Sequence, residues 1–166
     1  MTDNKAAARN LALMRMKEAL IEHVPHARAI GMTVVDVRRG QAWLMVPYDA
    51  KLVGNPDTGV IHGGVITTLL DNASGAAVQL ALPERQAIAT LDLRIDYMKP
   101  ATPGEDLHCH AHCYKLTRNI AFVRGVAYHK DPADPIATSV GTFMLAANRA
   151  EVMPVEIDKI LGKEAQ

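Results

Sequence analysis

The chain has 166 residues, enough for one domain with a substantial hydrophobic core and too few for two domains of ordinary size. Lysine plus arginine and aspartate plus glutamate number 18 each, so no basic excess argues for a nucleic-acid partner. No apolar stretch is long enough to span a membrane, and the first residues lack the apolar segment of a secretory signal. We therefore expect small-molecule or protein partners and a cytoplasmic location.

An amphipathic helix is predicted for residues 3 to 24, ending before Pro25. We expect this helix to form an extension, residues 1–29, that precedes a main domain of residues 30–146. The helix is predicted from apolar residues that recur at helical spacing, namely Leu13, Met16, Leu20 and Val24.

A hairpin is predicted next, with strands at residues 33–39 and 41–47 on either side of Gly40. Residues 49–61 are interrupted by glycine and proline and are expected to be a loop. Residues 63–80 then carry almost no polar face, which is typical of a helix that is buried on all sides.

Four strands are predicted after Pro83, the first from the alternation of apolar and charged residues that ends at Tyr97. In that alternation Leu91 and Leu93 would face the core. The order of elements favours an α+β architecture in which one antiparallel sheet of about six strands wraps a single central helix. The other three strands are expected at residues 105–115, 120–130 and 136–145. A tail, residues 147–166, follows them, with a short helix that begins at Pro154 and ends just before Gly162.

Two features of the predicted central helix suggest chemistry. Asp71 is its one carboxylate, and a lone ionised carboxylate in an apolar helix carries a desolvation cost unless something pairs with it or uses it. Gly63 and Gly64 at the helix start would let a substrate approach bare backbone N–H groups at the positive end of the helix dipole. Together they indicate an electrophile-binding end and a base.

These two features cannot act on the same atom within one helix. Eight residues separate Gly63 from Asp71, which is about 12 Å along a helix axis. If two copies of the helix lie side by side and antiparallel in a symmetric dimer, the glycines of one copy meet the aspartate of the other. We therefore expect a homodimer with two composite sites.

Further motifs accompany the glycines and the aspartate. Asn55 precedes the triplet His62-Gly63-Gly64, Asp71 follows the histidine by nine residues, and the later chain reads Leu93-Arg94-Ile95-Asp96-Tyr97-Met98-Lys99-Pro100-Ala101 and then Gly104-Glu105. In this combination, over about residues 30–146, the chain resembles the hotdog-fold acyl-CoA thioesterases, specifically the branch that includes phenylacetate-pathway and four-hydroxybenzoyl-CoA enzymes. The resemblance implies hydrolysis of an acyl-CoA thioester to a free acid and CoA, no cofactor beyond the CoA of the substrate, and a homotetramer built as a dimer of dimers.

The resemblance also implies a role for each matching residue. The Gly63 N–H would polarise the thioester carbonyl, while Asp71 of the partner subunit would act as general base on water or as nucleophile through an anhydride. Asn55 would help to hold the water or the carbonyl, and Thr90 would assist the aspartate or the water. The residues expected to bind the substrate, the phosphates and nucleotide of CoA included, are Gly64, Lys99, Arg118 and Asn119.

Several of these assignments have plainer alternatives. Asp71 could pair with Asn55 or with a backbone amide, and the glycines could serve close helix-to-sheet packing. His62 is expected to orient the loop rather than to act chemically, because the site already has a base. An ordinary polar turn accounts for Arg118 and Asn119 equally well. Thr90 has the strand parity of the outward-facing Asp92, so a bulge or the end of the strand must bring it to the site.

His108, His110 and His112 alternate on one face of the strand at 105–115, with Cys109 and Cys113 on the other face. Neighbouring imidazoles can chelate a metal, but a solvated outer face explains the row equally well, and no metal is expected. The two cysteines are four residues and about 13 Å apart along a strand, too far for a disulfide between them.

Two other functions remain open for the same fold. One is a non-catalytic acyl-CoA-binding protein, which lack of turnover would identify. The other is an acyl-thioester dehydratase or hydratase, which normally carries a His-x-x-Gly-x-Pro signature that residues 61–65 lack. The sequence leaves the acyl group open, as it does the choice between nucleophile and general base for Asp71.

Overall fold

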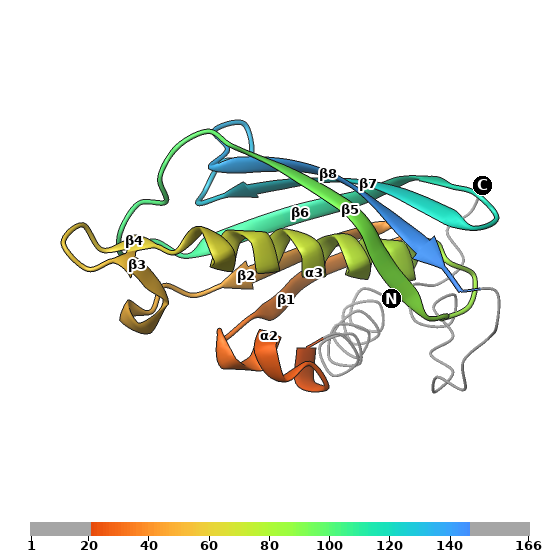
Figure 1. Cartoon of the computed structure of the whole chain (residues 1–166), viewed down its shortest axis with the longest axis horizontal. Coiled ribbons are helices and arrows are strands. Elements are labelled where there is room, and N and C mark those ends of the chain that lie inside the picture. Colours follow the sequence, from red (N-terminus) through yellow and green to blue (C-terminus); the bar gives the residue numbers. More distant parts are fainter. Residues whose placement is uncertain (1–20, 147–166) are drawn as a thin grey trace, which may run out of the picture.

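The computed structural model describes residues 21–146. The predicted C-terminal helix at 154–162 lies outside these residues, as does most of the predicted helix at 3–24. Figure 1 shows one long helix, α3 (Gly63–Ala81), packed against a single curved sheet. The sheet strands are β1 (Thr33–Arg38), β2 (Gln41–Val46), β5 (Ile88–Tyr97), β6 (Leu107–Leu116), β7 (Ile120–Tyr128) and β8 (Ala137–Leu145).

The six strands lie in the order β1-β2-β6-β7-β8-β5, and every neighbouring pair is antiparallel. The predicted hairpin around Gly40 is present, and Gly40 has a φ of 67°, in the left-handed region that favours glycine. This is the predicted α+β hotdog architecture, with one central helix and six antiparallel strands. No helix within residues 21–146 is both long and apolar enough to cross a membrane.

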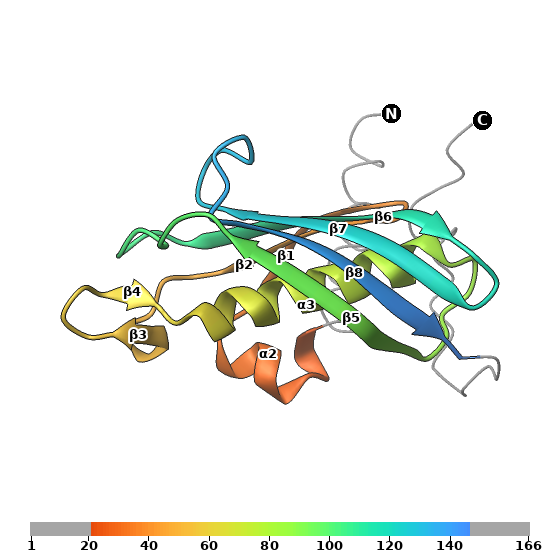
Figure 2. The same ribbon diagram turned by 45° about the horizontal axis from the view of Figure 1, so that its top comes forward.

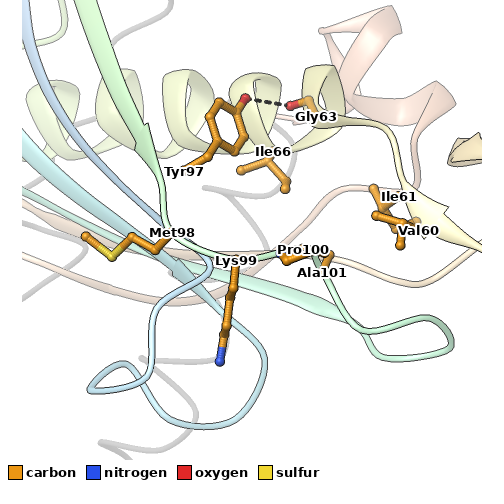
Figure 3. Close-up of a pocket in the computed structure, with 9 residues that line it drawn as sticks. All are labelled: Val60, Ile61, Gly63, Ile66, Tyr97, Met98, Lys99, Pro100 and Ala101. Carbon is orange, nitrogen blue, oxygen red and sulfur yellow. Dashed lines mark hydrogen bonds between the residues drawn. The ribbon is translucent and has the colours of Figure 1, made fainter.

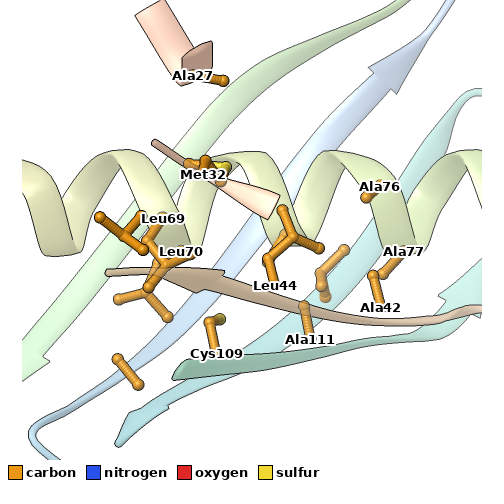
Figure 4. Packing of buried hydrophobic residues seen from close by; sticks show 14 of the residues in the cluster. Ala27, Met32, Ala42, Leu44, Leu69, Leu70, Ala76, Ala77, Cys109 and Ala111 are labelled. Atoms are coloured by element: carbon orange, nitrogen blue, oxygen red, sulfur yellow. The ribbon is translucent and has the colours of Figure 1, made fainter. Parts of the chain in front are cut away.

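The core lies between α3 and the inner face of the sheet (Figure 4). Leu69 and Leu70 of α3 are fully buried there, as are Leu44 of β2 and Cys109 of β6. Burial raises the pKa of the Cys109 thiol, so this cysteine behaves as a small apolar core residue. Cys109 and Cys113 are both buried and unpaired.

Residues 21–146 leave one side of α3 only partly covered, so the expectation of a helix buried on all sides is wrong. Residues three and four apart share a helix face, and here the small and polar ones line up along the less buried side of the helix, beside the edge strand β5. Short side chains such as threonine and glycine made this face look apolar in the sequence. We call this face the open stripe, formed by Gly64, Thr67, Thr68, Asp71, Asn72 and Gly75.

Three further differences concern element boundaries. The predicted loop at 49–61 contains a short 3-10 helix, η2 (Ala50–Leu52), and a small hairpin of β3 (Val53–Asn55) and β4 (Val60–Ile61). The strand expected from Leu91 begins at Ile88.

A short helix, α2 (Pro25–Ala29), follows Pro25 and lies next to α3 (Figure 2), where His26 Nε2 is 3.3 Å from Thr68 Oγ1. Its Ala27 is buried in the same hydrophobic core as the sheet. The division of the chain at residues 29 and 30 stays a prediction.

Candidate active site

His62 caps the start of α3. Its ring Nδ1 accepts a hydrogen bond from the Gly64 N–H at 2.9 Å, and its carbonyl accepts from the Val65 N–H at 2.9 Å. Its own N–H donates to the carbonyl of Leu52 at 2.9 Å, which ties the helix start to η2. An N-cap side chain satisfies one of the donors that the first helical turn leaves unpaired. The geometry is that of a positioning role for His62.

Gly63 and Gly64 differ in what their N–H groups do. The Gly64 N–H is engaged by His62, whereas the Gly63 N–H has no acceptor among residues 21–146. A Cβ on Gly64 would lie 2.9 Å from His62 Nδ1, so a larger residue there would displace the imidazole that caps the helix. A Cβ on Gly63 would lie 3.5 Å from the Tyr97 hydroxyl, an ordinary contact distance. One free donor, that of Gly63, therefore remains at the positive end of the helix dipole.

A hollow of about 360 Å³ adjoins Gly63 (Figure 3). Its lining is mostly apolar and joins the start of α3 to the end of β5. Sequence reasoning missed Ile66 as a lining residue, and it quoted Tyr97 and Met98 only as part of a motif. The full lining consists of Val60, Ile61, Gly63, Ile66, Tyr97, Met98, Lys99, Pro100 and Ala101.

Asp71 lies two turns further along α3, half-buried on the open stripe. Its Oδ1 accepts a hydrogen bond of 3.0 Å from the Thr90 hydroxyl of β5. The register of β5 against β8 shifts between Thr90 and Asp92, and this bulge turns Thr90 towards α3, as the sequence parity required. The bulge also leaves Leu91 55% exposed, so the expectation that Leu91 faces the core is wrong.

Asn55 and Lys99 lie at the Gly63 end of the molecule and are already engaged. Asn55 ends β3, and its Oδ1 accepts from the Asp57 N–H at 3.0 Å within the β3–β4 turn. Lys99 forms an ion pair with Asp134 in the loop before β8.

Arg118 and Asn119 occupy the exposed β6–β7 turn at the opposite end of the sheet from β3 and β4 (Figure 1). The Asn119 carbonyl accepts from the Leu145 N–H at 2.8 Å. One protomer thus groups His62, Gly63 and Gly64 at one place and Asp71 with Thr90 at another. It does not bring Arg118 or Asn119 to either group.

Two histidines of the row on β6 contact neighbouring side chains on the outer face of the sheet. His110 stacks on Trp43 with ring centroids 4.2 Å apart, and its Nε2 lies 2.9 Å from Gln41 Oε1. Burial lowers the pKa of His110. His108 stacks on Tyr128 at 5.9 Å. Within residues 21–146, no three histidine, cysteine or acidic side chains are grouped as a metal site would need.

The architecture and the capped glycine start of α3 define a hotdog-fold protein. Known proteins are similar to this chain in sequence. Residues 58–136 match the family model described as thioesterase superfamily. The chain is 29% identical over 147 residues to the medium/long-chain acyl-CoA thioesterase YigI of Escherichia coli K12, covering 81% of this chain and 94% of that protein.

Two further comparisons match the chain. The chain is 43% identical over 65 residues to human acyl-coenzyme A thioesterase 13, which covers 39% of this chain and 45% of the human protein. A crystal structure of a Pseudomonas aeruginosa protein has a TM-score of 0.72 and 43% identity to this chain, covering 80% of this chain and 98% of that one. Residues 58–136 therefore carry the sequence pattern of the thioesterase superfamily, and the relatives named as acyl-CoA thioesterases agree with the family predicted from the motifs.

Proposed function

We propose that this protein is an acyl-CoA thioesterase, which hydrolyses an acyl-CoA to a free acid and CoA. The observation that carries the proposal is the free N–H of Gly63, held at a capped helix start beside an apolar hollow. The thioester carbonyl oxygen becomes negatively charged in the transition state, and one preorganised donor is worth about 3 kcal/mol in comparable sites. The names of YigI and acyl-coenzyme A thioesterase 13 support the same reaction.

The second half of the proposed site is Asp71 of the partner subunit. As general base, its carboxylate takes a proton from water while the water oxygen adds to the carbonyl carbon. The tetrahedral intermediate then collapses, the carbon–sulfur bond breaks, and the carboxylic acid returns the proton to the CoA thiolate. As nucleophile, the Asp71 carboxylate would instead add to the carbonyl carbon and displace the CoA thiolate as the carbon–sulfur bond breaks. Water would then hydrolyse the resulting anhydride, regenerating the carboxylate and giving the free acid, and the proton released goes to the CoA thiolate. In both routes Thr90 holds Oδ1, which leaves Oδ2 for the reaction.

Two features of the protomer support a composite site in a dimer. The open stripe leaves the Asp71 side of α3 accessible to a second copy. Strand β5 lies at the edge of the sheet, and among the described residues no strand pairs with its outer side. Proteins seldom leave a long edge strand bare. A second copy that pairs antiparallel along β5 would lay the two α3 helices side by side, which is the arrangement that the spacing of Gly63 and Asp71 requires. A dimer of dimers remains a prediction from the family.

The apolar lining of the hollow favours an apolar acyl group. Because YigI is named for medium and long chains, these acyl-CoAs are the first substrates to assay, with aromatic acyl-CoAs beside them. A non-catalytic acyl-CoA-binding protein would bind these compounds without releasing CoA.

The test of the proposed function is Asp71→Asn, which keeps the size of the side chain and removes its charge. Hydrolysis should fall by about a hundredfold or more, because positioned acid–base or covalent catalysis is lost. Acyl-CoA binding should persist, and the thermal unfolding midpoint should stay the same or rise, because a half-buried charge is removed. The matched control is Asp92→Asn, at an exposed position on β5. A folded, fully active Asp71→Asn protein would end the proposed mechanism.

A further inference from the structure

Tyr97, the last residue of β5, reaches across to the first turn of α3. Its hydroxyl donates to the Gly63 carbonyl at 3.0 Å (Figure 3) and lies 2.8 Å from Thr67 Oγ1, which is itself 3.2 Å from the same carbonyl. The two hydroxyl protons can satisfy this triangle, because Tyr97 donates to Gly63 and Thr67 donates to either oxygen. The three residues therefore form a closed network of hydrogen bonds.

The Gly63 carbonyl does not need Tyr97 to avoid being unpaired. In an α-helix this carbonyl already accepts the bond from the residue four positions on. Tyr97 itself is 51% exposed, so its hydroxyl could equally point to water. The contact thus adds a constraint at a position where the backbone would otherwise be loose, since two consecutive glycines begin the helix and glycine restricts the backbone least.

The same strand holds both proposed half-sites. Thr90 of β5 bonds the Asp71 carboxylate, and Tyr97 of β5 bonds the Gly63 carbonyl, so β5 fixes both functional positions of α3. Tyr97 contacts Gly63 from the side of the hollow, whereas the His62 cap comes from the loop before the helix.

We propose that Tyr97 is a positioning residue for hydrolysis, whose hydroxyl fixes the Gly63 residue so that the free Gly63 N–H points at the developing oxyanion. The phenol ring has a separate role as a wall of the hollow. The hydroxyl should therefore govern kcat, and the ring should govern KM. The inference rests on the proposed thioesterase function, because it assigns a task to the Gly63 N–H.

The test compares Tyr97→Phe, which keeps the ring, with Tyr97→Ala, which removes the ring and the hydroxyl. With a medium-chain acyl-CoA, Tyr97→Phe should lower kcat about fivefold to tenfold and change KM less than about twofold, because an interaction that serves the transition state is lost. Tyr97→Ala should lower kcat similarly and raise KM several-fold as well. Thr67→Val, which removes the other hydroxyl of the triangle, should lower kcat by a smaller factor.

Tyr48→Phe is the matched control. The Tyr48 hydroxyl also donates to a glycine carbonyl, that of Gly59 at 2.9 Å, but Tyr48 does not line the hollow. If tyrosine–glycine bonds were merely structural, both phenylalanine variants would lower the unfolding midpoint alike and neither would change kcat. We expect similar unfolding midpoints for the two variants and a loss of kcat for Tyr97→Phe alone.

A double variant tests the positioning role of Tyr97 separately from the proposed thioesterase function. In a Gly63→Pro background the N–H is gone, so adding Tyr97→Phe should cause no further loss of kcat. Full additivity of the two losses, or a Tyr97→Phe enzyme with unchanged kcat, would overturn the positioning role. If Gly63→Pro itself kept full activity, the proposed oxyanion function would fail instead.

Discussion

The two proposed functional positions of α3, Gly63 and Asp71, are built in different ways. At Gly63 the functional group is a backbone N–H, and the chain holds it from two sides, through His62 and Tyr97, next to a hollow. At Asp71 the functional group is a side chain that one hydrogen bond from Thr90 orients on the open stripe. In the proposed composite site, the Gly63 N–H and the side chains that support it come from one protomer, while the Asp71 carboxylate acts on a carbonyl that the partner presents.

The largest effect on hydrolysis is expected from a change at Gly63, which tests the backbone half of the comparison with Asp71. Gly63→Pro removes the N–H at the first helical position, where proline is well tolerated, and His62 already has the extended backbone that precedes a proline. Hydrolysis should fall about a hundredfold or more, with the fold retained. Gly63→Ala is the control, because it keeps the N–H and its Cβ meets Tyr97 at an ordinary distance. Steady-state kinetics and thermal unfolding of both variants test whether the Gly63 N–H is the oxyanion donor. Undiminished turnover in folded Gly63→Pro would refute the oxyanion role.

A smaller effect on kcat is expected at Thr90, which supports the Asp71 half of the proposed site. Thr90→Val removes the hydroxyl that orients Asp71 and nearly preserves the shape of the side chain. We expect kcat to fall about tenfold, less than for Asp71→Asn, because the carboxylate itself remains. Thr142→Val, on the outer side of the neighbouring strand β8, provides the control. Equal kcat for the two valine variants would show that the Thr90 bond is only structural.

The smallest effect concerns stability and distinguishes the two glycines. Gly64→Ala places a Cβ 2.9 Å from His62 Nδ1 and disturbs the cap, whereas Gly63→Ala meets no such contact. Both alanines gain similar helix propensity, so the difference between them reports the cap. Gly64→Ala should have a free energy of unfolding about 1 kcal/mol lower than Gly63→Ala, as for the loss of other N-caps. Urea unfolding of both variants measures this difference, and equal stabilities would mean that the cap contributes nothing.

Local patterns were enough to predict much of this molecule. The apolar run after His62 predicted α3, alternation predicted the long strands, and Gly40 marked the first hairpin. The parity of Thr90 required a bulge or the end of the strand, and β5 contains a bulge between Thr90 and Asp92. These features depend on residues that are near one another in the chain.

What the sequence did not predict depends on contacts between distant residues. Tyr97 bonds a carbonyl 34 positions earlier, and nothing in the spacing of the strand indicates that contact. The β3–β4 hairpin has strands of three and two residues, too short to display alternation. The engagement of the Gly64 N–H by His62 depends on a side-chain rotamer, which a sequence pattern does not encode.

The central claim is that each site joins Gly63 of one subunit to Asp71 of the other, and mixing two inactive variants tests it directly. Gly63→Pro and Asp71→Asn homodimers each lack one half of both sites. After dissociation and reassociation of an equal mixture, every heterodimer would hold one site with neither change, so activity should recover to about a quarter of the wild-type value. If both halves of a site came from the same chain, every site in the mixture would carry one of the two changes. The activity would then stay at the level of the separate variants, and the composite site would be refuted.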